Sequence, residues 1–170
     1  MTFSEQILAT LIGTFFGFMG SLVLFWIKEK VTKNNQKNSL VNNLRYELDY
    51  NIALYRKYEA DITKCIECIG ADDRTTFLNI DYEYIARFFA IQFYQNGLIQ
   101  DYLHHEDMKR WNDFMITLSS GSQKYAVEQL QAWKNKEIKK EDAFSSLSHE
   151  RDQIRDALKM TIYIKDKVTP

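Results

Sequence analysis

The sequence has almost no proline and little glycine. Its 170 residues include one Pro, at the last position, and six Gly. Three of these glycines fall inside a single apolar run, so few residues remain of the kind that β-turns require. The composition therefore argues against a β-rich fold and predicts an all-α protein.

An excess of basic residues is also missing. The chain has 22 Lys and Arg against 23 Asp and Glu, a formal net charge of -1. Proteins that bind nucleic acids usually present a basic surface to the phosphates. We therefore expect no direct binding of nucleic acid. The sequence also lacks the G-x-x-x-x-G-K-[ST], G-x-G-x-x-G and G-x-S-x-G motifs, which argues against P-loop, dinucleotide-binding and α/β-hydrolase sites.

Cysteine and histidine are too few for a metal centre. Cys65 and Cys68 form a C-x-x-C, but a structural zinc site needs four ligands and the chain has no third cysteine. Thioredoxin-like chemistry would place such a pair after a strand, whereas this pair lies late in a helical pattern. Adjacent His104 and His105 would point about 100° apart on a helix and could not hold one metal. We expect no metal and no cofactor, with the cysteines serving as small core residues.

What the chain does have is one long apolar run, from Ile7 to Ile27, without a charge. At 1.5 Å per residue, these helical residues would span about 30 Å, the thickness of the hydrocarbon core of a bilayer. No basic residue precedes the run and its end does not resemble a cleavage site, so a signal peptide is disfavoured. The sequence predicts a transmembrane anchor with its flanks at residues 1–30 and a helical domain at 31–170.

The flanks of this run differ in charge. Four lysines follow it closely, at Lys28, Lys30, Lys33 and Lys37, and none precedes it. Because basic flanks stay in the cytoplasm, we expect the N-terminus outside and the helical domain in the cytoplasm. Trp26, with Lys28 and Lys30, is expected to mark the membrane interface, which makes the lipid bilayer the first expected partner.

One side of the apolar run is made of small residues. At about 100° per residue, seven of them fall within an arc of about 140°. They are Ala9, Thr10, Gly13, Thr14, Gly17, Gly20 and Ser21. Small residues allow the close backbone approach by which helices associate in lipid. The pattern favours a self-associating helix or one that lines a narrow assembly; the alternative is that glycine is simply common in membrane helices.

The rest of the chain has helical periodicity. Apolar residues recur at three- and four-residue steps from Leu40 to Ile69, which predicts a long helix that ends at Gly70. Four further helices are expected, over 82–94 with Asp81 as N-cap, 98–118, 123–135 and 142–167, with a linker at 119–122. The long first helix and the last helix are expected to pack together in one bundle.

The last helix contains a polar cluster with one arginine in an unusual place. Arg151 falls within the apolar stripe of this helix, whereas Asp156 faces the opposite way. An arginine directed at a core needs a partner, because an unpaired buried charge is costly. Arg151 is thus expected to be a paired residue at a helix or subunit interface; the alternative is the remnant of a ribonuclease site.

In this layout the chain resembles the small membrane accessory proteins encoded beside the RNA-guided RNA-cleaving effectors of type VI-B CRISPR systems. Those proteins carry a divergent HEPN-like helical domain, and HEPN ribonucleases use R-x-x-x-x-H. The matching stretch here is Arg151 to Asp156, with aspartate in place of the histidine. The intact motif is absent, so Arg151 and Asp156 are only weak catalytic candidates and no enzyme activity is expected.

The resemblance implies a homo-oligomeric ring or pore in the bacterial inner membrane. Such an assembly would strengthen antiphage defence and would be functionally linked to an RNA-guided CRISPR effector. The alternative function is a membrane-tethered adaptor without pore activity. An adaptor would dock a cytoplasmic partner through the aromatic segment from Tyr82 to Tyr94.

Overall fold

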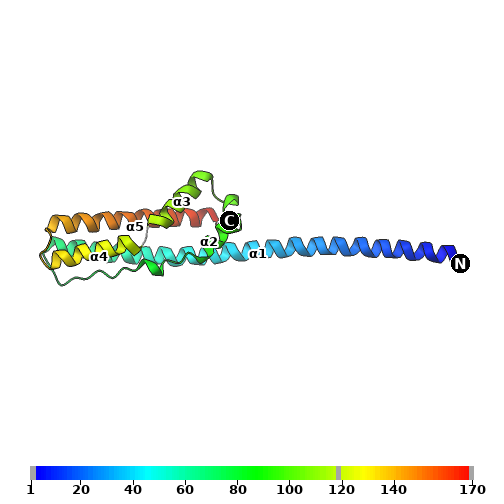
Figure 1. Ribbon diagram of the computed structural model, residues 1–170, viewed down its shortest axis with the longest axis horizontal. Coiled ribbons are helices and arrows are strands. Elements are labelled where there is room, and N and C mark those ends of the chain that lie inside the picture. Colours follow the sequence, from blue (N-terminus) through cyan, green and yellow to red (C-terminus); the bar gives the residue numbers. More distant parts are fainter. Residues whose placement is uncertain (1–2, 118–119, 169–170) are drawn as a thin grey trace. The chain divides into compact units, whose positions relative to one another are not determined.

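The structure, a computed structural model, describes residues 3–117 and 120–168, without the side chains of residues 4–10 and 114–123. These residues form helices and loops with no strand among them, which confirms the all-α fold. The elements in chain order are α1 (Phe3–Gly70), the 3₁₀ turn η1 (Tyr82–Tyr84), α2 (Phe88–Gln95), the 3₁₀ turn η2 (Leu98–Asp101), α3 (His105–Thr117), α4 (Ser120–Lys134) and α5 (Lys140–Val168) (Figure 1).

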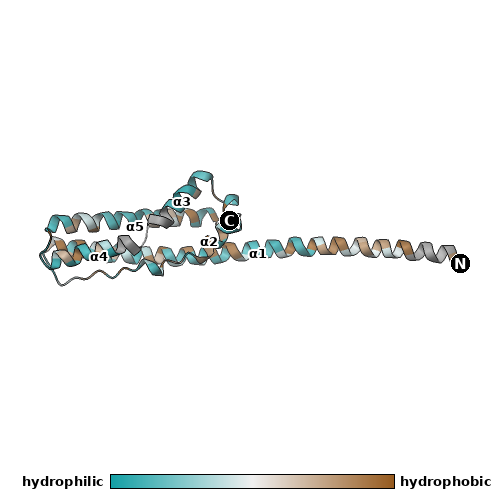
Figure 2. Cartoon of the chain, in the orientation of Figure 1, coloured by the Kyte–Doolittle hydropathy of each residue, from teal (hydrophilic) through white to brown (hydrophobic). Residues whose placement is uncertain are grey.

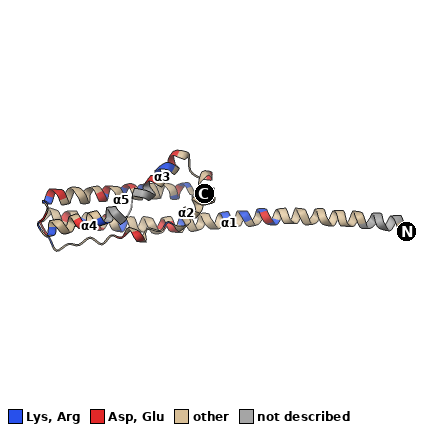
Figure 3. Cartoon of the chain, in the orientation of Figure 1, with Lys and Arg blue, Asp and Glu red and all other residues tan. Residues whose placement is uncertain are grey.

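The chain divides into two compact units, Met1–Leu40 and Val41–Pro170. In the first unit, the apolar side chains of residues 11–27 are exposed, with Phe16 at 68% and Leu24 at 69%. Figure 2 shows this part of α1 as mainly hydrophobic, and Figure 3 shows no charge on it and several charges directly after it. Among the described residues, α1 is the one helix long and apolar enough to cross a membrane, with a mean hydropathy of 1.7 over its best window.

In the second unit, the later part of α1 lies beside α4 and α5 (Figure 1). As predicted, the first and last helices pack together. Asp49 of α1 lies 2.5 Å from Nζ of Lys165, and Glu59 accepts a hydrogen bond of 2.5 Å from Nε of Arg155. Arg45 donates from Nε and Nη2 to the carbonyl oxygen of Val168, at 3.0 and 2.6 Å. A cation at this place satisfies a carbonyl that the end of a helix leaves unpaired.

The core of this unit consists of two clusters. One lies around Tyr55, Ile62 and Trp133, and the other around Leu44, Phe93 and Ile164. The loop after α1 is attached to the end of α4 by Arg74, whose guanidinium lies 5.1 Å from the Trp133 ring centroid and donates to the Trp133 carbonyl. The α1 stripe that the sequence predicts is thus the common surface on which the other elements pack.

The end of α1 lies at Gly70, as predicted. Asp73 donates its backbone N–H to the carbonyl of Cys68 at 2.8 Å, and Asp72 takes a left-handed conformation with φ of 56°. Nζ of Lys140 donates to the Gly70 carbonyl at 2.5 Å. A left-handed residue just beyond the last turn and a cation on its carbonyls are common ways to stop a helix.

Two of the helices were expected to be continuous, and this expectation is wrong because each is interrupted. The chain from 82 to 94 is a 3₁₀ turn followed by an extended residue, Ile85, with φ of -67° and ψ of 112°; α2 begins only at Phe88. Likewise, the expected helix 98–118 begins as η2, and α3 starts at His105. The break before α2 has a tertiary cause, because side chains of α1 bind the backbone of residues 86, 89 and 90.

The expected linker at 119–122 is also wrong where the structure describes it. Helix α4 begins at Ser120 and includes Gly121 and Ser122, whereas Ser119 lies outside the described residues. Serine is favoured at the beginning of helices, so a Ser-rich stretch can start a helix as well as separate two. Helix α5 extends the expected range 142–167 by a few residues at its start and one at its end.

Candidate functional site

The small-residue face of α1 is the first candidate site; we use this name for Gly13, Gly17, Gly20 and Ser21 with the predicted Ala9, Thr10 and Thr14. A Cβ built on any of the three glycines meets no atom within 4 Å, neighbouring helix backbone aside. The Ser21 hydroxyl donates to the carbonyl oxygen of Gly17 at 2.9 Å, so it is satisfied inside the helix. The side chains of Ala9 and Thr10 lie outside the described residues. The described part of this face is thus smooth and uncovered.

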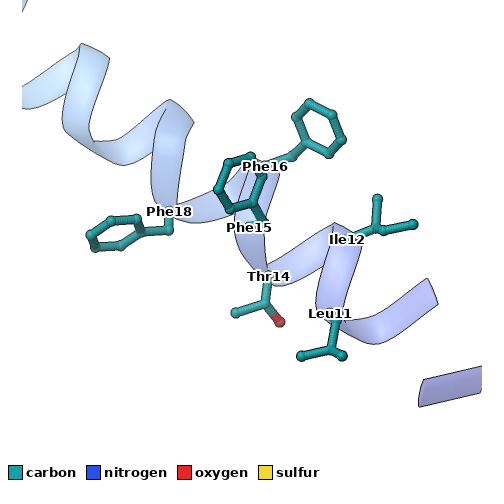
Figure 4. Close-up of a pocket in the computed structure, with 6 residues that line it drawn as sticks. All are labelled: Leu11, Ile12, Thr14, Phe15, Phe16 and Phe18. Atoms are coloured by element: carbon teal, nitrogen blue, oxygen red, sulfur yellow. The ribbon is translucent and has the colours of Figure 1, made fainter. Parts of the chain in front are cut away.

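The other side of the apolar run carries bulky apolar side chains. Leu11, Phe15 and Phe18 are each 60 to 62% exposed. In the close-up they project outward from a single helix, with Thr14 among them (Figure 4). Thr14 therefore lies at the border between the small-residue face and the bulky side. Such side chains are suited to contact with lipid tails.

The predicted membrane-interface residues lie at the end of the apolar run and directly after it. Trp26 is 62% exposed, and Nζ of Lys30 lies 5.3 Å from its ring centroid, a cation–π contact. Lys28 and Lys33 are exposed, and Lys33 Nζ lies 2.7 Å from a carboxylate oxygen of Glu29. An amphipathic ring beside ammonium groups is the arrangement that suits a headgroup layer.

In the helical domain, two buried polar residues of α1 position α2. The carboxylate of Glu47 accepts from the N–H groups of Phe89 and Ala90 at 2.7 and 3.0 Å, so it caps the start of α2 from another helix. The Asn51 amide accepts from the Ala86 N–H at 2.9 Å and donates to the Ala86 carbonyl at 2.7 Å. Sequence reasoning missed both residues. The sequence contains one sign of their role, because both polar residues fall among the apolar positions of the α1 stripe.

A second buried polar contact joins η1 to α5. Tyr82 and Glu150 are 3% and 4% exposed, and the Tyr82 hydroxyl donates to the Glu150 carboxylate. Burial, reinforced by this hydrogen bond and by the Glu150 charge, raises the pKa of Tyr82 well above its usual range. This contact was also missed, because nothing local in the sequence indicates which carboxylate a tyrosine will meet.

The two weak catalytic candidates make separate contacts. Arg151 is partly buried; its Nε lies 3.7 Å from the carboxylate of Asp152 and has no hydrogen-bond partner among the described residues. Asp156 is exposed and accepts a hydrogen bond of 2.9 Å from Lys159. Arg155 has the closer partner, because its Nε donates a hydrogen bond to the carboxylate of Glu59. Each candidate thus contacts a neighbouring residue of its own helix.

The described thiols and imidazoles do not form a metal-binding cluster. Cys65 is buried, its Sγ lies 3.4 Å from the carbonyl oxygen of Phe77, and burial raises its pKa. Cys68 is half-buried, and His104 and His105 are exposed. Among the described residues, no three His, Cys, Asp or Glu side chains are grouped so that they could hold a metal ion.

The aromatic segment from Tyr82 to Tyr94 is split between core and surface. Tyr82 and Phe93 are buried, whereas Phe88 and Tyr94 are each 63% exposed. Tyr94 lines a groove of about 450 Å³ together with Arg87, Ala90, Ile91, Trp111 and their neighbours. Part of the segment is thus available for contact with another molecule.

The described residues thus offer an uncovered face in the apolar part of α1 and an aromatic surface on α2. Comparison of the chain with protein-family models, curated proteins and solved structures found no match.

Proposed function

We propose that the protein is a single-pass membrane protein that assembles into a homo-oligomeric ring or pore through the small-residue face of α1. The observation behind this proposal is the open space at Gly13, Gly17 and Gly20, where no described atom lies within 4 Å of a built Cβ apart from nearby helix backbone. In lipid, helices gain nothing from hiding apolar surface from water, so association depends on close packing. A smooth face of this length offers such packing to a second copy.

The hydroxyl groups on this face suit a second role. Thr14 lies at one border of the arc, with Ser21 and Thr10 next to it, whereas the bulky apolar residues face elsewhere. In a ring of such helices, these hydroxyls would lie near any water-filled path. The proposed orientation, with the N-terminus outside and the helical domain in the cytoplasm, follows from the lysines after Ile27.

The mass of the detergent-solubilised full chain tests the assembly. A discrete large oligomer is expected; a monomer would overturn the proposal. The double variant Gly13→Leu/Gly17→Leu fills the open space on the small-residue face and should lower the mass and abolish ion flux in liposomes. The matched control Ile12→Leu/Met19→Leu introduces leucine on the bulky side and should change neither readout.

The layout resemblance extends this proposal to a role as an accessory effector of RNA-guided CRISPR defence in the bacterial inner membrane. Its test is phage survival in cells that contain an RNA-targeting effector, with and without this protein. Protection should rise when the protein is present and fall back with Gly13→Leu/Gly17→Leu. Arg151→Ala and Asp156→Ala should keep the protection, since the ribonuclease motif is incomplete. Equal phage survival with and without the protein would overturn this role.

The exposed aromatic surface of α2 favours a second candidate, a membrane-tethered adaptor. Tyr94 is exposed in the lining of a groove and Phe88 is exposed on the same helix, an arrangement typical of protein contact sites. An adaptor predicts that Phe88→Ser/Tyr94→Ser abolishes the cellular effect, although the native chain gives no ion flux in liposomes. The pore proposal predicts instead that this variant keeps the cellular effect, whereas Gly13→Leu/Gly17→Leu loses the cellular effect and the ion flux together.

A further inference from the structure

The helix surface just after the apolar run forms a distinct basic strip, by which we mean Trp26, Lys30, Lys33, Asn34 and Lys37. Trp26, Lys30, Lys33 and Lys37 follow one another at steps of about one helical turn, Asn34 is next to Lys33, and all five fall within an arc of about 100°. Lys30, Lys33, Asn34 and Lys37, together with Val31, line a surface groove of about 500 Å³. Lys28, although nearby in sequence, falls on another side. The residues of the strip therefore share one side of the helix, and they do more than add positive charge after the apolar run.

The side chains of the strip supply hydrogen-bond donors. Three ammonium groups and the Asn34 amide face one groove, and the indole of Trp26 lies at its start, 5.3 Å from Nζ of Lys30. Within the strip, Lys33 is paired with Glu29, whose carboxylate lies 2.7 Å from its Nζ, so one negative charge stands against three lysines in this part of the sequence. The groove thus keeps a net positive charge. Ammonium and amide donors together fit the oxygens of a phosphate group.

The side of the helix on which the strip lies indicates the source of that phosphate. At about 100° per residue, the strip is centred about 150° from the small-residue face and on the same side as Ile12, Phe15 and Met19. All these residues belong to the first unit and to one uninterrupted helix. If the small-residue face is covered by a second copy, the strip stays in contact with lipid, at the depth where headgroups begin.

We propose that the basic strip is a binding site for the phosphate group of an anionic phospholipid. Trp26 anchors the site at the interface, and Lys30, Lys33 and Lys37 hold the headgroup. The inference rests on the membrane-spanning part of the proposed function and does not require a pore. A basic residue near an anionic membrane surface is worth about fivefold in affinity, so each lysine replaced should lower lipid affinity by about that factor.

The experiment uses the full chain in nanodiscs of phosphatidylcholine with a minor fraction of phosphatidylglycerol. The protein is then extracted gently, and the lipids that remain bound are identified by native mass spectrometry. Phosphatidylglycerol should be enriched several-fold over its share in the nanodisc. The variant Lys30→Gln/Lys33→Gln/Lys37→Gln should retain lipids in proportion to the bulk mixture. The control Lys57→Gln/Lys64→Gln/Lys124→Gln removes the same charge from exposed positions of the helical domain and should keep the enrichment.

The outcomes separate this inference from the proposed function. Enrichment that survives in the strip variant, or absent enrichment in the native sequence, overturns the site. Competition by inorganic phosphate at low millimolar concentration would also overturn it, because the site would then bind a free anion. The same spectra report the number of subunits. A monomer that still selects phosphatidylglycerol would refute the assembly and leave the lipid site standing.

Discussion

The hydroxyl of Tyr82 donates a hydrogen bond to the carboxylate of Glu150, a residue 68 positions further along the chain. Both side chains are buried, and the contact ties the segment after α1 to the middle of α5. A buried carboxylate needs donors, because water cannot reach it. The pair therefore joins η1 to α5 by a polar contact that is shielded from water.

Replacing Tyr82 by Phe should destabilise the protein by about 2 to 3 kcal/mol, since the variant leaves the Glu150 carboxylate without this donor. Urea unfolding of the full chain in detergent measures the effect. The control is Tyr84→Phe at the exposed neighbour, which should change the free energy of unfolding little. If the two variants are equally stable, the buried contact does not contribute to folding.

Stability should fall at alkaline pH. The pKa values of Tyr55, Tyr58 and Tyr82 are raised above the ordinary value of 10.0, with burial as the largest cause in each case. As the pH rises past about 10, the unfolded chain loses these protons before the folded protein does, so unfolding becomes more favourable. The contribution of these groups is fully present below this pH and declines above it.

Thermal unfolding between pH 8 and 11.5 checks this expectation. The unfolding temperature should be nearly constant at first and then drop above pH 10, less steeply in Tyr82→Phe than in the native sequence. Replacement of the exposed Tyr46 by Phe should leave the slope as it is. A temperature that stays level up to pH 11.5 would refute the alkaline loss.

Glu47 should control the start of α2. The variant Glu47→Ala removes the acceptor of the Phe89 and Ala90 N–H groups and should cost about 1 to 3 kcal/mol, with faster amide hydrogen exchange at these two residues. Glu67→Ala, at an exposed position of the same helix, is the control. Unchanged exchange at Phe89 and Ala90 would show that α2 forms without this cap.

The sequence was sufficient for the features that depend on short-range pattern. The stripe from Leu40 to Ile69 predicted the later part of α1 and its end at Gly70, and the spacing in the last helix predicted α5. The break before α2 was not predictable, because its cause is Glu47 and Asn51, 35 to 43 residues earlier in the chain. Helical spacing shows which residues share a side but not which distant backbone they will bind.

The candidate site shows the same limit. The small-residue face followed from helical geometry and needed no contact information. The need of an arginine for a partner was also recognised, yet it is Arg155 that has a partner on α1, Glu59, at 2.5 Å. Arg151 and Arg155 lie about 40° apart on the helix, a difference smaller than the uncertainty of an ideal wheel.

The two thiols should differ in reactivity. Cys65 is buried with a raised pKa, so little thiolate forms and little reagent reaches it, whereas Cys68 is half-buried beside an open groove. Alkylation of the folded protein, followed by mass spectrometry, should modify Cys68 several-fold faster. In urea the two rates should converge. Faster modification of Cys65 in the folded state would contradict its burial.

The orientation across the membrane can be read with a cysteine probe. In Ser4→Cys, a maleimide that cannot cross membranes should label intact cells, because the N-terminus is expected outside. A cysteine at an exposed position of the helical domain, Lys136→Cys, should be labelled only after the cells are broken. The opposite pattern would reverse the proposed topology.

The contact between Arg45 and Val168 spans 123 residues of sequence. At a synthesis rate of about 5 to 20 residues per second, Val168 is added roughly 6 to 25 s after Arg45. The apolar run is complete even earlier, so the membrane insertion proposed for it can precede folding of the helical domain. Until α5 is complete, the apolar stripe of α1 lacks one of its partner helices, and a chaperone or the membrane surface itself would have to shield the uncovered part. A message truncated before α5 would leave the proposed anchor joined to a partly uncovered, aggregation-prone helix.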